Sequence, residues 1–408
     1  MDPRKAAWWV MERLESAGYQ AYLVGGCVRD ELLGKQPKDY DVTTDARPET
    51  VQALFPRTAA TGLKHGTVTV IHHGQPVEVT TFRVETGYSD HRRPDKVVFV
   101  SRLEEDLARR DFTVNAMAMD REGRLYDPFG GQKDLKERRI RAVGNAEARF
   151  TEDALRMLRA IRFSAQLGFR ITDETGRAIR RMRHTLRHLA VERVTAELEK
   201  MWSVPSPSIG VQYLQEWELL PHLPPFHRWN HIQKAALLPA ERFDRLTTRE
   251  GRWGLLLHDC HVLPEQAARH LRLLRLKSAD VKMINRIYQL AFDSRHWHPI
   301  TPTEGKRLLL QHGTEPVLQS LQWSRVMGHL ETETAERLEV LFERWAKEMP
   351  VRQLSDLAID GSDLIRVTGE PPGRWVGQAL AYLLEQVALG RLPNERSRLL
   401  EEGRRFGK

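Results

Sequence analysis

The feature that most constrains the fold is a change of residue pattern near position 140. Before it, short runs rich in β-branched residues are separated by Gly, Pro and Asp, which is typical of strands and turns. These runs occupy residues 22–24, 67–72, 77–82, 97–100 and 114–120. Beyond position 140, Leu, Arg, Glu and Ala recur at helical spacing almost to the C-terminus. The sequence therefore predicts an α+β N-terminal head followed by an elongated, all-α remainder.

A chain of 408 residues is long enough for several domains, each with its own core. Proline-rich stretches interrupt the helical pattern and supply candidate boundaries. We expect a head over residues 1–140, a helical neck over 141–200, a helical body over 201–295 and a helical tail over 296–408.

Charge and cysteine content narrow the class of protein. The formal net charge is +8 and the pI is about 9.5, which suits a polyanionic partner. The two cysteines, Cys27 and Cys260, argue against a disulfide framework and favour a reducing compartment. No segment approaches the roughly 20 apolar residues of a membrane span, and the N-terminus lacks a signal-peptide core. We expect a cytoplasmic protein without a membrane partner, and its oligomeric state stays open.

A glycine pair follows the first predicted strand. Residues 22–24 lead into Gly25 and Gly26, where a backbone without side chains can approach phosphate oxygens closely. A short helix is expected over residues 28–33, with Arg29 in it. Taken alone, a glycine pair after a strand is also common in ordinary turns.

Two carboxylates follow about a dozen residues later. Asp39 and Asp41 fall in a predicted strand over residues 39–43, where a period of two places both on one face. Oxygen ligands so placed suit Mg²⁺ that also binds substrate phosphates. The alternative is a solvated strand face. The carboxylates and the glycine pair together, in this order, favour a nucleotide-triphosphate site.

A second group of polar residues lies in the neck. A helix is expected from Thr151, its N-cap, to about residue 167, where Gly168 stops it. At helical spacing, Asp153, Arg156 and Arg159 share one sector. The simplest interpretation is an ion pair on a solvated helix face.

With a nucleotide site upstream, this pair also suits base selection. Cytosine and adenine each present an amino donor beside a ring-nitrogen acceptor, whereas uracil and guanine present a carbonyl beside a ring N–H. A carboxylate only accepts hydrogen bonds and a guanidinium only donates them. Asp153 and Arg156 could therefore accept CTP and ATP and reject UTP and GTP, because a mismatch leaves buried polar groups unpaired.

In this order and spacing, the motifs resemble those of bacterial class II CCA-adding enzymes, members of the tRNA nucleotidyltransferase and poly(A) polymerase family. The similarity covers residues 21–200 and returns at residues 357–377. It implies a head with a polymerase-beta-type nucleotidyltransferase sheet. By this resemblance Asp39 and Asp41 are catalytic and hold a two-ion Mg²⁺ site, and Glu78 is the candidate third carboxylate by its position on a neighbouring strand.

The resemblance also implies which residues contact the nucleotide. They include the glycine pair, the motif over residues 109–117 that engages ribose and phosphates, and the base-selecting helix of the neck. The implied residues are Gly25, Gly26, Arg29, Arg110, Asp111, Asn115, Asp153, Arg156, Arg159 and Arg162.

The implied activity is template-independent addition of CCA to the 3′ end of tRNA, with CTP and ATP as substrates and pyrophosphate as the leaving group. Residues 61–67 look like the version found in tRNA enzymes, and residues 85–95 resemble a loop that CC-only members shorten. Full CCA addition is therefore expected. The alternatives are a partial CC- or A-adding enzyme, a poly(A) polymerase, and an RNA-binding protein with a degenerate active site. The last is disfavoured because the chain has Asp39 and Asp41 as well as Asp153 and Arg156.

Two further signals concern RNA and metals. From Arg156 to Arg193 there are ten arginines and three acidic residues, a net charge of +7, which suits the phosphates of a tRNA acceptor stem or forms solvated helix faces. His258-Asp259 is the dipeptide of metal phosphohydrolases, with His231 and Asp280 as distant partners. As half of a motif in an apolar segment, it is set aside.

Overall fold

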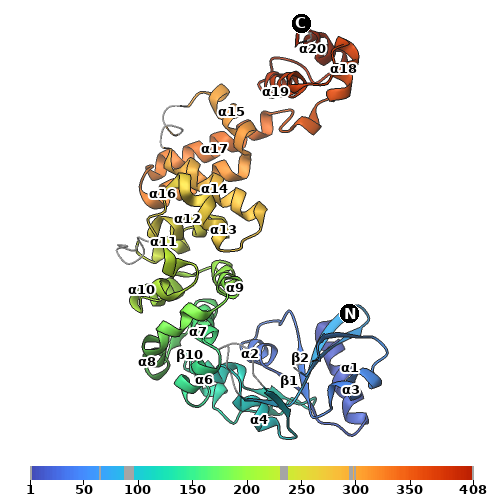
Figure 1. The fold of residues 1–408 in the computed structure, drawn as a ribbon, viewed down its shortest axis with the longest axis vertical. Coiled ribbons are helices and arrows are strands. Elements are labelled where there is room, and N and C mark those ends of the chain that lie inside the picture. The colour runs from blue at the N-terminus through green and yellow to red at the C-terminus, as the bar shows by residue number, and fades with distance from the viewer. Residues whose placement is uncertain are drawn as a thin grey trace. The chain divides into compact units, whose positions relative to one another are not determined.

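The structure is a computed structural model that describes residues 2–63, 66–86, 96–229, 238–293, 297 and 300–406. The chain divides into two compact units, Met1–Lys234 and Ala235–Lys408, and each is described by itself (Figure 1). The finer division into head, neck, body and tail stays a prediction.

A seven-stranded sheet forms the centre of the head. Its strand order is β3-β4-β5-β2-β1-β8-β9, and all neighbours are antiparallel except β2 and β5, which are parallel. The strands are β1 (Ala21–Val24), β2 (Asp41–Thr44), β3 (Thr58–Gly62), β4 (Thr67–His72), β5 (Gln75–Thr81), β8 (Ala118–Met119) and β9 (Leu125–Tyr126). A separate two-stranded sheet joins β6 (Arg83–Thr86) to β7 (Lys96–Phe99).

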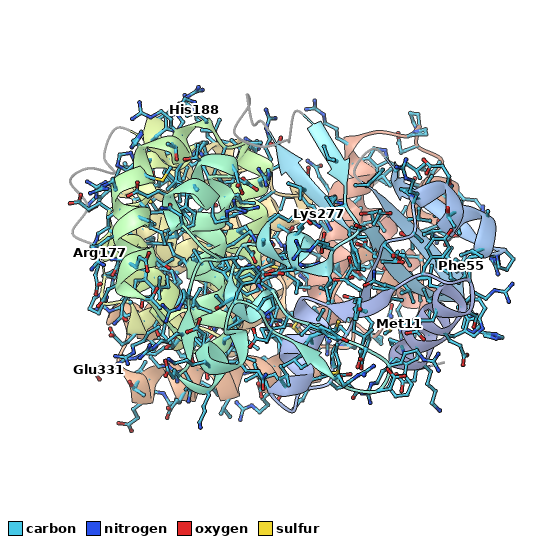
Figure 2. The ribbon with its side chains drawn as sticks, turned by 90° about the horizontal axis from the view of Figure 1, so that it is seen from below. Met11, Phe55, Arg177, His188, Lys277 and Glu331 are labelled. Atoms are coloured by element: carbon cyan, nitrogen blue, oxygen red, sulfur yellow. The ribbon has the colours of Figure 1, made fainter. Side chains whose placement is uncertain are left out.

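Helices α1 (Pro3–Ser16) and α3 (Pro48–Leu54) pack against this sheet (Figure 1). Asp2 caps α1 by accepting a hydrogen bond from the amide of Arg4 at 2.9 Å. The apolar face of α1 is fully buried, and Figure 2 shows Met11 of this face on the same side of the head as Phe55. The remaining head helices are α2 (Gly26–Leu32), α4 (Leu103–Ala108) and α5 (Gly131–Lys136).

Of the five β-branched runs, four form strands as predicted, and the strand predicted over residues 39–43 is present as β2, but the strand expected over residues 114–120 is wrong. Residues Thr113–Asn115 form a 3₁₀ turn, and only Ala118–Met119 pairs in the sheet. The amide of Asn115 bonds the carbonyl of Phe112, and the Asn115 side chain bonds Arg29 and Asp111. These tertiary bonds outweigh the β propensity of the run.

The second half of the first unit is largely helical, as expected. It contains α6 (Ala146–Glu152), α7 (Leu155–Leu167), α8 (Asp173–Met182), α9 (Val191–Trp202), α10 (Ser208–Glu216) and 3₁₀ turns at Arg183–His188, Leu220–His222 and Phe226–Arg228. One difference is a short parallel pair of β10 (Arg139–Ile140) and β11 (Arg170–Ile171).

The single helix expected from Thr151 is also wrong. Thr151 lies in the last turn of α6, where its hydroxyl donates to the carbonyl of Glu147, so it is not an N-cap. Asp153 adopts an extended conformation and breaks the helix, and its Oδ1 accepts the amide of Leu155 at 3.0 Å. Asp153 therefore takes the capping role expected of Thr151. The end of α7 at Gly168, with φ of 69°, is as predicted.

The second unit is helical throughout its described part. It contains α11 (Glu241–Asp244), α12 (Arg249–Asp259), α13 (Pro264–Leu273), α14 (Ser278–Phe292), α15 (Pro302–His312), α16 (Thr314–Met327), α17 (Thr332–Glu348), α18 (Gly361–Thr368), α19 (Arg374–Ala388), α20 (Arg396–Gly403) and 3₁₀ turns at Leu354–Asp356 and Arg404–Phe406. One apolar cluster runs from α14 to α20 and includes Phe342 and Trp345. Among the described residues, no helix has the length and apolar character needed to cross a bilayer.

Candidate active site

The glycine pair lies at the turn between β1 and α2. Gly25 has φ of 80°, which favours glycine, and a Cβ there would lie 3.0 Å from Nη1 of Arg110. Gly26 is the first residue of α2, so the amides of the first helical turn lack helical partners. The turn therefore offers backbone donors beside a guanidinium group.

The two carboxylates lie at the start of β2. Asp39 and Asp41 are exposed, whereas Tyr40 and Val42 between and after them are buried, so the predicted alternation is confirmed although the ladder begins only at Asp41. On the parallel neighbour β5, Glu78 lies in register with Asp41.

Negative charge is concentrated at this point. One face of Asp41 is open to solvent, yet enough protein surrounds its carboxyl group that burial raises its pKa to about 6, aided by the charges of Glu78 and Asp39 and opposed by Arg110. A cation bound there would relieve this repulsion, so Asp39 and Asp41 fit a divalent metal. Among the described residues no group of three acidic, His or Cys side chains is arranged to hold a metal ion, and the role of Glu78 as a third ligand stays a prediction.

Sequence reasoning missed a buried aspartate, Asp106, that pairs with the first two arginines of the motif over residues 109–117. Asp106 is fully buried and pairs with Arg109 at 2.8 Å and with Arg110 at 3.2 Å. Burial alone would raise the pKa of Asp106, but the two guanidinium groups hold it below its usual value. The i,i+3 and i,i+4 spacing was the signal available in the sequence.

Asp111 and Asn115 belong to a network that joins the head to α7. Asp111 pairs with Arg159 at 2.5 Å and accepts a hydrogen bond from Asn115 at 3.3 Å. Asn115 in turn accepts from Arg29 at 2.7 Å, and Arg29 is 4% exposed. Although burial alone would raise the pKa of Asp111, the charge of Arg159 lowers it. Four of the residues expected at the nucleotide are thus brought together.

Among the contacts of the described residues, the side chains of Asp153 and Arg156 do not pair with each other, and the two residues are joined by their backbones, where the Arg156 amide donates to the Asp153 carbonyl at 3.0 Å. The two carboxylate oxygens of Asp153 accept from Arg193 of α9 at 3.1 and 2.7 Å. Arg156 donates to Glu152 at 2.5 Å and to the backbone carbonyl of Arg109 at 2.9 Å. Each side chain is therefore held by its own partners, which leaves the acceptor and the donor as separate functional groups.

Arg162 is the most enclosed of the expected nucleotide contacts in the neck. Its side chain is 9% exposed and pairs with Glu197 of α9, whose side chain is 4% exposed. Glu197 also pairs with Lys200 at 3.2 Å. Sequence reasoning missed Glu197 because its partner lies 35 residues away.

The arginines of the neck fall into two sets. Arg156, Arg159, Arg162 and Arg193 form the internal ion pairs described above. The outward set consists of Arg170, Arg177, Arg180, Arg181 and Arg187, which are exposed, and the half-buried Arg183. Figure 2 shows Arg177 at the surface of this region, with His188. Of these two sets, the outward one is the more exposed and suits contacts with the backbone phosphates of an RNA.

Other sequence signals have separate outcomes. The loop expected over residues 85–95 lies outside the described residues from 87 to 95, as do Lys64 and His65 of the segment at 61–67. His231, the distant partner proposed for His258-Asp259, also lies outside them, and Asp280 lies 4.0 Å from Arg249.

Asp259 is nevertheless a buried carboxyl group whose pKa is raised. It is 2% exposed, and burial raises its pKa to about 7, opposed by the amide of Leu238 at 3.3 Å and by Arg242. The folded state therefore holds this proton more tightly than the unfolded state. We expect the contribution of Asp259 to stability to be complete below about pH 4 and to be lost as the pH rises to about 7, by at most about 4 kcal/mol.

The measurement is urea unfolding of the protein and of Asp259→Asn between about pH 4 and pH 8. The Asn variant should gain stability relative to the parent as pH rises across this range, since the amide carries no charge. A constant difference between the two proteins would contradict this expectation.

Models of known protein families match three segments of the chain. The Poly A polymerase head domain matches residues 21–141, the probable RNA and SrmB-binding site of polymerase A matches 168–229, and the putative tRNA nucleotidyltransferase domain 2 matches 244–402. The chain is 40% identical to the CCA-adding enzyme of Geobacillus sp. (strain WCH70), over 98% of this chain and 96% of the relative. The CCA-adding enzyme of Bacillus subtilis (strain 168) is 37% identical over 96% of each chain.

A solved structure also matches the chain over nearly its whole length. The crystal structure of the Bacillus stearothermophilus CCA-adding enzyme in complex with CTP has a TM-score of 0.82 and 37% identity, covering 99% of this chain and 97% of the other. Fold and sequence thus agree over nearly the whole length. The chain belongs to the bacterial CCA-adding enzyme family and is an enzyme of the nucleotidyltransferase class.

Proposed function

We propose that this protein adds CCA to the 3′ end of tRNA without a nucleic-acid template, using CTP and ATP and releasing pyrophosphate. The observation that carries the proposal is the pre-organised pair in the neck: Asp153 held by Arg193, and Arg156 held by Glu152. An anchored acceptor and an anchored donor match the Watson–Crick edges of cytosine and adenine. Relatives named CCA-adding enzymes support the same activity.

Enzymes of this class generally use a divalent metal, and here we propose two Mg²⁺ ions held by Asp39 and Asp41. When bound, they would supply Lewis-acid activation of the attacking 3′ hydroxyl and compensate the phosphate charge. The amide of Gly26 and the guanidinium of Arg110 would bind the triphosphate. Gly25, whose own amide donates to the carbonyl of Met117 at 3.2 Å, would let the backbone approach the phosphates closely. Arg29, Arg159 and Arg162 would contribute further positive charge, and Asp111 and Asn115 would fix the position of those arginines.

The deciding experiment offers the purified protein three tRNA substrates with Mg²⁺. One lacks the CCA end, one lacks only the final A, and one is complete, and each receives CTP, ATP, UTP or GTP alone or as the CTP and ATP pair. Addition of CCA that stops at the complete end is expected. A long A tail would indicate a poly(A) polymerase, addition of only C or only A would indicate a partial enzyme, and no incorporation would leave an RNA-binding protein.

The tRNA partner and a cytoplasmic location are part of the same proposal. We expect affinity for tRNA to fall at least about tenfold between about 50 and 200 mM salt, because the outward arginines of the neck would release counterions from phosphates. Fluorescence anisotropy of labelled tRNA measures this directly. An affinity that hardly changes with salt would remove these arginines from the binding surface.

A further inference from the structure

Phe163 of α7 has an unusual set of neighbours. Its ring is 6% exposed, and three guanidinium groups lie over it. The guanidinium carbon is 3.8 Å from the ring centroid for Arg162 and 5.3 Å for both Arg29 and Arg159. All three distances are within the range in which a cation interacts with an aromatic face.

The three arginines come from different parts of the proposed nucleotide site. Arg29 lies in α2, which follows the glycine pair of the head, whereas Arg159 and Arg162 lie in α7 of the neck. No other aromatic ring in the described part of the chain contacts more than one arginine in this way. The Phe163 ring is therefore the shared apolar contact of head and neck arginines.

Acidic and amide groups restrain the same guanidinium groups at their edges. Arg29 donates to Asn115 and Asp30, at 2.7 and 2.8 Å. Arg159 pairs with Asp111, and Arg162 with Glu197. Because guanidinium N–H groups point outward in the plane of the group, the Phe163 ring can attract the three cations without competing for those donors.

Phe163 also contacts the motif that carries Arg110 and Asp111. Its ring meets that of Phe112 edge to face, with centroids 5.9 Å apart and an interplanar angle of 79°. Phe112 is fully buried. The ring, itself part of α7, thus contacts Arg29 of α2, Phe112 of the 109–117 motif and two arginines of its own helix.

We propose that Phe163 is a positioning residue of the nucleotide site, whose ring holds the guanidinium groups of Arg29, Arg159 and Arg162 in the orientation that binds the incoming triphosphate. This inference rests on the proposed function. It assigns Phe163 an effect on nucleotide binding and not on tRNA binding or on the chemical step.

The test compares two substitutions at this position. Phe163→Met keeps a similar volume without a ring, and Phe163→Tyr keeps the ring. Phe55→Met is the matched control, since Phe55 is 3% exposed and its ring contacts Trp9 of α1 instead of an arginine. Steady-state kinetics with CTP and ATP, anisotropy with labelled tRNA, and thermal unfolding are measured for each variant.

We expect Phe163→Met to raise KM for both CTP and ATP by roughly tenfold. Values of kcat and tRNA affinity should stay within about twofold. Phe163→Tyr should bring KM back most of the way to the parent value. Phe55→Met should change KM by less than about twofold, even if its melting temperature falls by as much as that of Phe163→Met.

An unchanged KM in Phe163→Met would overturn the inference. So would an equal rise in Phe55→Met, or a Tyr variant as impaired as the Met variant. These outcomes are separate from failure of the proposed function, in which the parent protein itself does not extend tRNA.

Discussion

Asp41→Ala is expected to reduce nucleotide transfer by at least about a thousandfold while leaving tRNA affinity within about twofold. The carboxylate lies at the start of β2 near Asp39 and in register with Glu78, where burial, aided by the charges of these two residues, raises its pKa to about 6. In the proposed metal site the substitution removes one of the two carboxylates and leaves Asp39 alone. We expect tRNA to bind through other surfaces, including the outward arginines of the neck.

Single-turnover extension of tRNA lacking its CCA end measures this effect, with anisotropy for affinity. The control is Asp45→Ala, because Asp45 follows the same strand but accepts hydrogen bonds from Gln20 at 2.8 and 3.2 Å. It should transfer nucleotides at close to the parent rate. Substantial transfer by Asp41→Ala would show that the metal site lies elsewhere.

The second large effect concerns base selection. Asp153→Asn is expected to lower discrimination against UTP and GTP by about a hundredfold. An amide of the same shape can turn a donor toward the carbonyl of uracil or guanine, whereas a carboxylate accepts only. The substitution also weakens the charged bond from Arg193, so the side chain is less firmly held.

Each of the four nucleotides is offered separately to the tRNA lacking CCA, and kcat/KM is compared. Asp363→Asn is the matched control, because Asp363 also accepts from an arginine, Arg396, through both oxygens but belongs to α18 of the second unit, where Arg366 lies 3.6 Å away. It should leave selectivity unchanged. Continued strict use of CTP and ATP by Asp153→Asn would remove Asp153 from the selection of the base.

Part of the molecule could be predicted because local pattern carries the information. The β-branched runs of the head and the helical spacing beyond position 140 follow from side-chain period, and four strands and the end of α7 agree with the structure. The alternation around Asp39 and Asp41 is equally local, because it needs only one strand and its pleat.

Predictions failed where a residue is held by partners distant in sequence. The run at 114–120 has strand propensity, but the side chain of Asn115 is bonded by Arg29, 86 residues away. Thr151 was the expected N-cap, yet Asp153 breaks the helix where Arg193, 40 residues on, binds it. A sequence read in short windows contains neither partner.

By itself, the sequence determined an α+β head followed by a helical remainder, the glycine turn after β1 and the identity of the acidic and basic residues, because each depends on chemistry and spacing within a few residues. Only the tertiary structure decided which charged group holds which. Asp111 with Arg159, Asp153 with Arg193 and Glu197 with Arg162 are pairs made in three dimensions. The physical reason is that a buried charge needs an opposite partner at hydrogen-bond distance. The packing of α7 against the head supplies the first of these pairs, and residues of α9 supply Arg193 and Glu197 for the other two.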